Sequence, residues 1–143
     1  MRFMLLVKAN RDSEAGAIPD QKMLSEMGRY NQELLNAGIM LAGEGLQPSS
    51  KGVRVKFSAG GPPTVTNGPF PETTQLVAGY WLWQAKSKEE AIEWLKRAPF
   101  HTDTEVELRQ LHEAEDFASS DPSGELRAQE ERQRKQAAAN ARR

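Results

Sequence analysis

Few residues of this chain have types and spacings that could do chemistry. The 143 residues include two histidines and no cysteine, which excludes thiol catalysis and disulfides. His101 and His112 lack metal-ligand spacing and belong to no recognisable set of ligands with nearby carboxylates. The sequence also lacks a phosphate-binding loop, a dinucleotide-binding motif and the surroundings of a serine nucleophile. We therefore expect no metal site and no cofactor, and we identify no catalytic residue.

A set of aromatic and charged side chains could instead bind a ligand. Alternation along the predicted strand 104–111 places Val106 and Leu108 on one face and Arg109 on the other. A face that combines charges with aromatic rings is typical of a small-molecule cleft, and also of a dimer interface with internal ion pairs. The candidate ligand-binding residues are Tyr30, Glu44, Phe70, Glu72, Tyr80 and Arg109.

Arg109 is the candidate anchor for an acidic ligand, because a guanidinium group binds a carboxylate or phosphate through two parallel hydrogen bonds. The alternative is that Glu105 and Glu107 neutralise Arg109 and that it only stabilises its own face of the strand. Tyr30 likewise has two interpretations, since it lies on the apolar stripe of a predicted helix and could belong to the core.

Two predicted strands are apolar on both faces, and this feature decides the architecture. They cover residues 2–9 and 76–84. A strand with one face in water alternates apolar and polar residues, so these two strands must be central and covered on both sides. Predicted helices at 20–37 and 87–98 can cover one face. The other face needs a further layer, a ligand or a partner subunit, and we expect a homodimer.

The remaining predicted elements are short. Residues 10–19 are expected to form a polar loop, 39–42 a strand, and 53–57 with 64–66 a hairpin whose Val53, Val55 and Phe57 point inward. The glycines of Gly43-Glu44-Gly45 allow close backbone approach or a bulge. These elements complete a domain at 1–117. Residues 118–143 are polar all round, which predicts a flexible tail or an exposed helix.

The segment Asn67-Gly68-Pro69-Phe70-Pro71 is expected to be a stiff turn, because two prolines fix the backbone. A glycine between Asn67 and Pro69 suggests a backbone conformation that other residues adopt poorly. We expect this turn to direct Phe70 inward, near the ligand cleft.

Three motifs together resemble the YCII-related family, in its DGPF-domain group: MRFMLLVKANRDSEAG, AGEGLQPSSKG and NGPFPETTQLVAGY. The resemblance implies an α+β, ferredoxin-like β-α-β-β-α-β sandwich with a β-hairpin insertion, dimeric and of the α/β-barrel type. Some members are proposed to use a histidine–aspartate pair, whose places fall near Met27 and Ala98 here. Neither residue can transfer a proton, so we do not assign that mechanism.

Composition limits the remaining possibilities. The formal net charge is −1, which gives no overall field to attract nucleic acid or a membrane surface. No apolar run approaches the roughly 18 residues of a membrane span, and a cytoplasmic location is expected. The predicted function is binding of a small molecule in a cleft at the dimer interface, with enzymatic activity left open. The alternative is a non-catalytic interaction or regulatory protein.

Overall fold

The computed structural model describes every residue from 1 to 143. The chain divides into two compact units, Met1–Leu111 and His112–Arg143. The predicted division into a domain at 1–117 and a tail at 118–143 stays a prediction.

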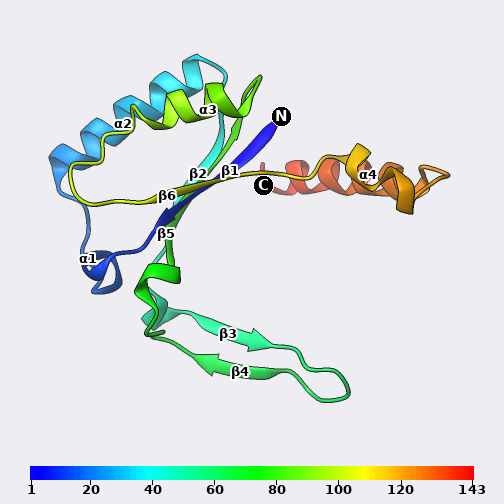
Figure 1. Cartoon of the computed structure of the whole chain (residues 1–143), viewed down its shortest axis with the longest axis horizontal. Helices are drawn as coiled ribbons and strands as arrows, with labels where there is room; N and C mark the ends of the chain where they lie inside the picture. The colour runs from blue at the N-terminus through cyan, green and yellow to red at the C-terminus, as the bar shows by residue number, and fades with distance from the viewer. The chain divides into compact units, whose positions relative to one another are not determined.

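The first unit has a four-stranded antiparallel sheet in the order β2-β5-β1-β6. The strands are β1 (Arg2–Lys8), β2 (Met40–Gly45), β5 (Val77–Gln84) and β6 (Val106–Gln110). Two helices, α2 (Gln21–Asn36) and α3 (Lys88–Leu95), lie against one face of this sheet (Figure 1). This order of strands and helices is the ferredoxin-like plan, which confirms the predicted fold class. Both strands that are apolar on two faces, β1 and β5, are central as predicted.

The face of the sheet that carries the helices holds the core. Its buried residues are Phe3, Leu5, Tyr30, Leu34, Ile39, Trp81, Trp83, Ala85 and Ala91. Cross-strand partners share a face of the sheet, and Leu5 is opposite both Trp81 and Leu108. Val106 and Leu108 pack against this core, as their alternation predicted.

The first core helix has clear start and stop signals. The Asp20 carboxylate accepts the backbone N–H of Met23 at 2.8 Å, so it caps the N-terminus of α2. Gly38 follows the last turn with φ of 72°, the left-handed conformation that glycine adopts most easily. These two caps explain why α2 lies close to its predicted bounds.

The opposite face of the sheet, here called the outer face, has no helix of the first unit against it. By register, Met4, Leu6, Tyr80 and Leu82 lie there, beside Glu107 and Arg109. All four apolar or aromatic side chains are half-buried by their neighbours in the single chain. A largely apolar sheet face of this kind normally contacts another layer.

Two local predictions were wrong. The predicted loop at 10–19 contains a short helix, α1 (Arg11–Glu14), because Asn10 and Ser13 cap it reciprocally. The hairpin consists of β3 (Val53–Lys56) and β4 (Thr64–Asn67), which pair only with each other. Its residues Val53, Val55 and Phe57 were predicted to point into a core, yet they are exposed, since no other element of the first unit covers them.

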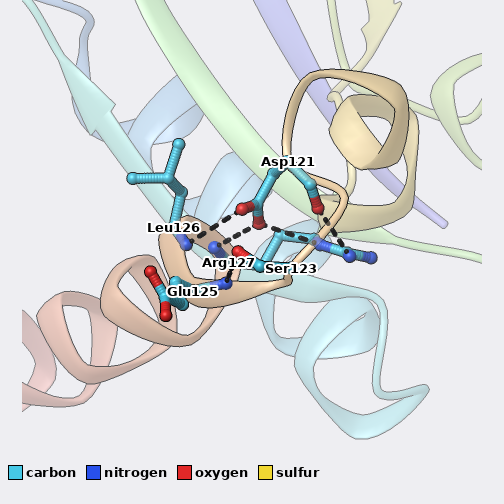
Figure 2. A network of polar contacts seen from close by, with 5 residues as sticks. All are labelled: Asp121, Ser123, Glu125, Leu126 and Arg127. Carbon is cyan, nitrogen blue, oxygen red and sulfur yellow. Dashed lines mark hydrogen bonds and ion pairs between the residues drawn. The ribbon is translucent and has the colours of Figure 1, made fainter.

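The second unit contains a 3-10 helix, η3 (Ala114–Ser120), and the helix α4 (Glu125–Asn140). Asp121 is only 5% exposed and organises the start of α4 (Figure 2). Its carboxylate accepts the backbone N–H groups of Leu126 and Arg127 at 3.2 and 3.0 Å, and the Nε–H of Arg127 at 3.2 Å. The backbone hydrogen bond from Arg127 lowers the pKa of Asp121 most. The helix itself has no buried residue.

Candidate functional site

A pocket opens on the helix side of the sheet, between α2 and the ends of β2 and β5. Its volume is about 280 Å³. It is lined by Val7, Met27, Asn31, Gly43, Glu44, Gly45, Ala78, Gly79, Tyr80, Trp81 and Phe100. This volume lies just below the roughly 300–1,000 Å³ of pockets for drug-sized ligands, so it suits a small molecule.

Three glycines create the floor of this pocket. Gly43 is opposite Trp81 and Gly45 is opposite Gly79, so alternation places all three glycines on the helix side of the sheet. Side chains at these positions would occupy the space below α2. A Cβ atom on Gly43 would lie 2.7 Å from Cδ1 of Trp81, and one on Gly79 would lie 3.0 Å from the Glu44 carbonyl oxygen. The pocket therefore depends on glycine at these positions.

The polar side chain within the pocket is Asn31 of α2. Its Oδ1 accepts the indole N–H of Trp81 at 3.0 Å, which fixes the amide and leaves its NH₂ group as a donor. Trp81 is held in turn by edge contacts with Tyr30 and Phe100, at centroid distances of 6.0 and 6.1 Å. Aromatic walls and one oriented amide can bind a small molecule that carries a hydrogen-bond acceptor.

Glu26 and His101 form a contact, and each is the sequence neighbour of a residue that lines the pocket. Glu26 precedes Met27 and His101 follows Phe100, and both of those neighbours line the pocket. Nε2 of His101 meets Oε2 of Glu26, and this hydrogen bond is the main cause that lowers the pKa of Glu26. The Glu26 side chain is 24% exposed and the His101 side chain 59%. A carboxylate paired with an imidazole can accept and return a proton.

The structure separates the six residues that the sequence proposed for a single ligand cleft. Glu44 and Tyr80 border the pocket, and they face each other across β2 and β5. By alternation their side chains belong to the outer face, so their contribution to the helix-side pocket is backbone. Arg109 also lies on the outer face, where it is 73% exposed and 3.8 Å from Glu107.

Tyr30, Phe70 and Glu72 lie elsewhere. Tyr30 is buried in the core, and its hydroxyl donates to the Trp94 carbonyl at 2.7 Å. Burial raises the pKa of Tyr30 to about 12, so the phenol stays protonated at neutral pH. Phe70 lies beneath the guanidinium of Arg54, 3.8 Å from ring centroid to Cζ, and Arg54 pairs with Glu72 at 3.6 Å.

The stiff turn is anchored by a polar network. Ser49 donates its backbone N–H to Glu14 at 3.0 Å and its hydroxyl to the same carboxylate, and its Oγ accepts the Phe70 N–H at 3.0 Å. The hydroxyl hydrogen bond is the main cause that lowers the pKa of Glu14. The network joins α1, the loop before β3 and the turn at Phe70, and so fixes the base of the hairpin.

Sequence reasoning missed Asn31, Phe100 and the Glu26–His101 pair. Asn31 follows Tyr30 on α2 and resembles an ordinary surface residue, and Phe100 lies in a loop with no periodic pattern. His101 was interpreted as a solvated loop residue, because Glu26 is distant in sequence and only the fold brings the two together. The sequence did contain a signal for the pocket. Gly43 and Gly45 are two residues apart, as are Gly79 and Trp81, so each pair lies on one face of its strand.

The model of the YCII-related domain matches residues 1–115. The chain belongs to the YCII-related family. The match covers β1 to β6, and with them the glycine-floored pocket and the outer face of this YCII-related domain. The search of curated proteins found no match. No helix of the chain is long and apolar enough to cross a bilayer.

One solved structure similar to this YCII-related protein is 5-chloro-2-hydroxyhydroquinone dehydrochlorinase from Burkholderia phenoliruptrix, in complex with 2,5-dihydroxybenzoquinone. The two share 18% sequence identity, and the alignment covers 80% of this chain and 98% of the other, with a TM-score of 0.42. A likeness at this level assigns neither the ligand nor the reaction of that enzyme to this chain.

Proposed function

We propose that this YCII-related protein binds a small, uncharged molecule in the glycine-floored pocket. The observation that carries the proposal is the set of three glycines on one side of the sheet, which leaves room below α2 where side chains would otherwise pack. The side chains that alternation and position direct toward this space are uncharged: Val7, Met27, Asn31, Trp81 and Phe100. A charged ligand would lose its hydration there without gaining a partner charge, which is unfavourable.

The expected ligand has a planar or compact apolar body with at least one hydrogen-bond acceptor. Its body would contact Trp81 and Phe100, and its acceptor would take a hydrogen bond from the Asn31 amide. This proposal differs from the acidic ligand that Arg109 suggested. It also places the ligand on the helix side of the sheet, and not in a cleft between two sheets.

We further propose that the protein is a homodimer joined through the outer face. Met4, Leu6, Tyr80 and Leu82 form an apolar row across the two central strands of that face. Burial of such a row contributes roughly 25 cal/mol per Å² of apolar area removed from water. The same row in an isolated chain would favour aggregation.

Filling the pocket should weaken ligand binding without unfolding the protein. A Cβ atom on Gly45 would meet nothing within 4 Å, so Gly45→Val places its side chain in open pocket space. We expect ligand-observed NMR with a library of uncharged carbonyl and amide fragments to find compounds that bind wild type. Their affinity for Gly45→Val should fall at least about tenfold, roughly 1.4 kcal/mol.

Gly61→Val is the matched control, because Gly61 lies near the tip of the hairpin and a Cβ atom there also meets open space. This control should bind the same fragments as wild type. Fragments that bind Gly45→Val and wild type equally would contradict the proposed site.

Catalysis at the pocket is the second candidate function, and the Glu26–His101 pair favours it. In this second hypothesis the imidazole of His101 exchanges a proton with the bound molecule, and Glu26 orients the ring. His101→Asn should then abolish turnover of any molecule that the protein converts, while the affinity for that molecule changes less than about twofold. Turnover that survives this change would exclude His101 as the proton carrier.

A further inference from the structure

The β3–β4 hairpin has one apolar face that no other element of the first unit covers. Val55 is opposite Val65 across the hairpin, and Val53 and Phe57 share their side by alternation. These four residues are between 45% and 77% exposed. The other side of the hairpin carries Arg54, Lys56, Thr64 and Thr66. The hairpin is therefore amphipathic, although both of its faces are in water in the single chain.

The base of this hairpin is nevertheless held firmly. Gly68 donates its N–H to the Gly52 carbonyl at 2.9 Å, and Phe70 donates to Ser49 Oγ at 3.0 Å. The Arg54 guanidinium stacks on the Phe70 ring. An isolated two-stranded hairpin is only marginally stable in water. A hairpin that is fixed at its base and apolar on one side has the properties of a docking element.

The area of the outer face indicates what the hairpin contacts. Four strands spaced about 4.8 Å apart, with a common length near six residues, give a face of roughly 400 Å². A standard protein interface buries roughly 800 Å² on each partner. The outer face alone is therefore smaller than the surface that a standard interface buries on each partner. The apolar side of the hairpin is the other uncovered apolar sheet surface of the first unit.

We propose that the hairpin of each copy lies with its apolar face on a second copy of this chain and so extends the interface between the outer faces. The inference rests on the homodimer proposed above. A two-fold symmetric dimer uses every contact twice, so each copy both gives and receives one hairpin. Val53, Val55, Phe57 and Val65 then leave water, while Arg54 and Lys56 remain on the solvent side.

Crosslinking from the hairpin tests this arrangement. The photoreactive residue p-benzoylphenylalanine is introduced in place of Phe57 in the full chain. Equal amounts of ¹⁵N-labelled and unlabelled protein are mixed, allowed to exchange subunits and irradiated. Mass spectrometry of the peptides should show crosslinks between a labelled and an unlabelled chain. The same residue introduced at Ile18, which is 85% exposed, is the control and should give few such crosslinks.

A second measurement separates this inference from the homodimer itself. Sedimentation of the double variant Val55→Lys, Phe57→Lys should show a dimer dissociation constant at least about tenfold higher than that of wild type. Lys56→Ala, on the polar side of the hairpin, is the control and should change this constant less than about twofold. One outcome would overturn the hairpin contact alone. In it the wild type is a dimer, the photoreactive residue in place of Phe57 crosslinks only within its own chain, and the double variant leaves the dissociation constant unchanged. A wild type that is monomeric at micromolar concentration would overturn both proposals.

Discussion

Replacement of Gly68 by alanine should destabilise the first unit by about 2–4 kcal/mol, which is large for the addition of one methyl group. A Cβ atom on Gly68 would lie 1.8 Å from the Ser49 carbonyl oxygen and 2.7 Å from the Ser49 carbonyl carbon. Both are backbone atoms, so no side-chain rotation can relieve the overlap. Ser49 is also held by Glu14 and by Phe70. Urea denaturation of Gly68→Ala measures the effect.

Gly61→Ala is the control for this prediction. A Cβ atom on Gly61 meets nothing within 4 Å, so the free energy of unfolding of Gly61→Ala should stay within about 0.5 kcal/mol of wild type. If Gly68→Ala unfolds at the same urea concentration as Gly61→Ala, the close approach of Gly68 to Ser49 does not occur in the folded protein.

Replacement of Leu82 by lysine should convert the proposed dimer into monomers. Leu82 lies on β5 near the middle of the outer face, opposite Met4 on β1 and Ala42 on β2. A lysine there would bring an unpaired charge into the dimer interface, and two-fold symmetry would place it there twice. We expect the dimer dissociation constant to rise at least about 100-fold, roughly 2.7 kcal/mol. Analytical ultracentrifugation measures it directly.

Leu24→Lys is the matched control for the dimer, because it makes the same change at a leucine of α2 that is 57% exposed. This variant should remain dimeric. A Leu82→Lys protein that sediments as wild type would show that the outer face is not the dimer interface. Circular dichroism of both variants confirms that each is folded.

The fold was predictable because its signals are local or periodic. The two-sided apolar patterns of β1 and β5 placed them in the centre of the sheet, and alternation along β6 assigned Val106 and Leu108 to the helix side. The hairpin was predictable as an element but not in its surroundings. Alternation predicted that Val53 and Val55 lie on the same side of the hairpin. It does not predict whether another element packs against that side.

The turn at Gly68 shows a prediction that had the right residue and the wrong cause. The sequence suggested that Gly68 has a backbone conformation that other residues adopt poorly. Gly68 is not among the glycines with positive φ, however, which are Gly16, Gly38, Gly60 and Gly124. Gly68 is required instead because the Ser49 backbone passes so close to it. A contact between positions 49 and 68 has no trace in local sequence, since it depends on how the chain returns after the hairpin.

The candidate pocket was only partly predictable. The glycines around Glu44 were recognised as places of close approach, and Tyr80 was placed on the correct strand. The sequence analysis followed the charged residues to the outer face, and the ligand-binding role that it gave Arg109 there stays a prediction. The absence of side chains at Gly43, Gly45 and Gly79 is what opens the pocket, and it does so on the opposite side.

The most direct test of the pocket follows its own glycines by NMR. The backbone amides of Gly43, Gly45 and Gly79 and the side-chain amide of Asn31 report on the floor and wall of the pocket in a ¹H–¹⁵N spectrum of wild type. Titration with an uncharged fragment that binds the protein should shift these four signals most, while the signals of Gly61 and Arg109 stay in place. Shifts that instead centre on Arg109 and the outer face would contradict the helix-side pocket as the ligand site.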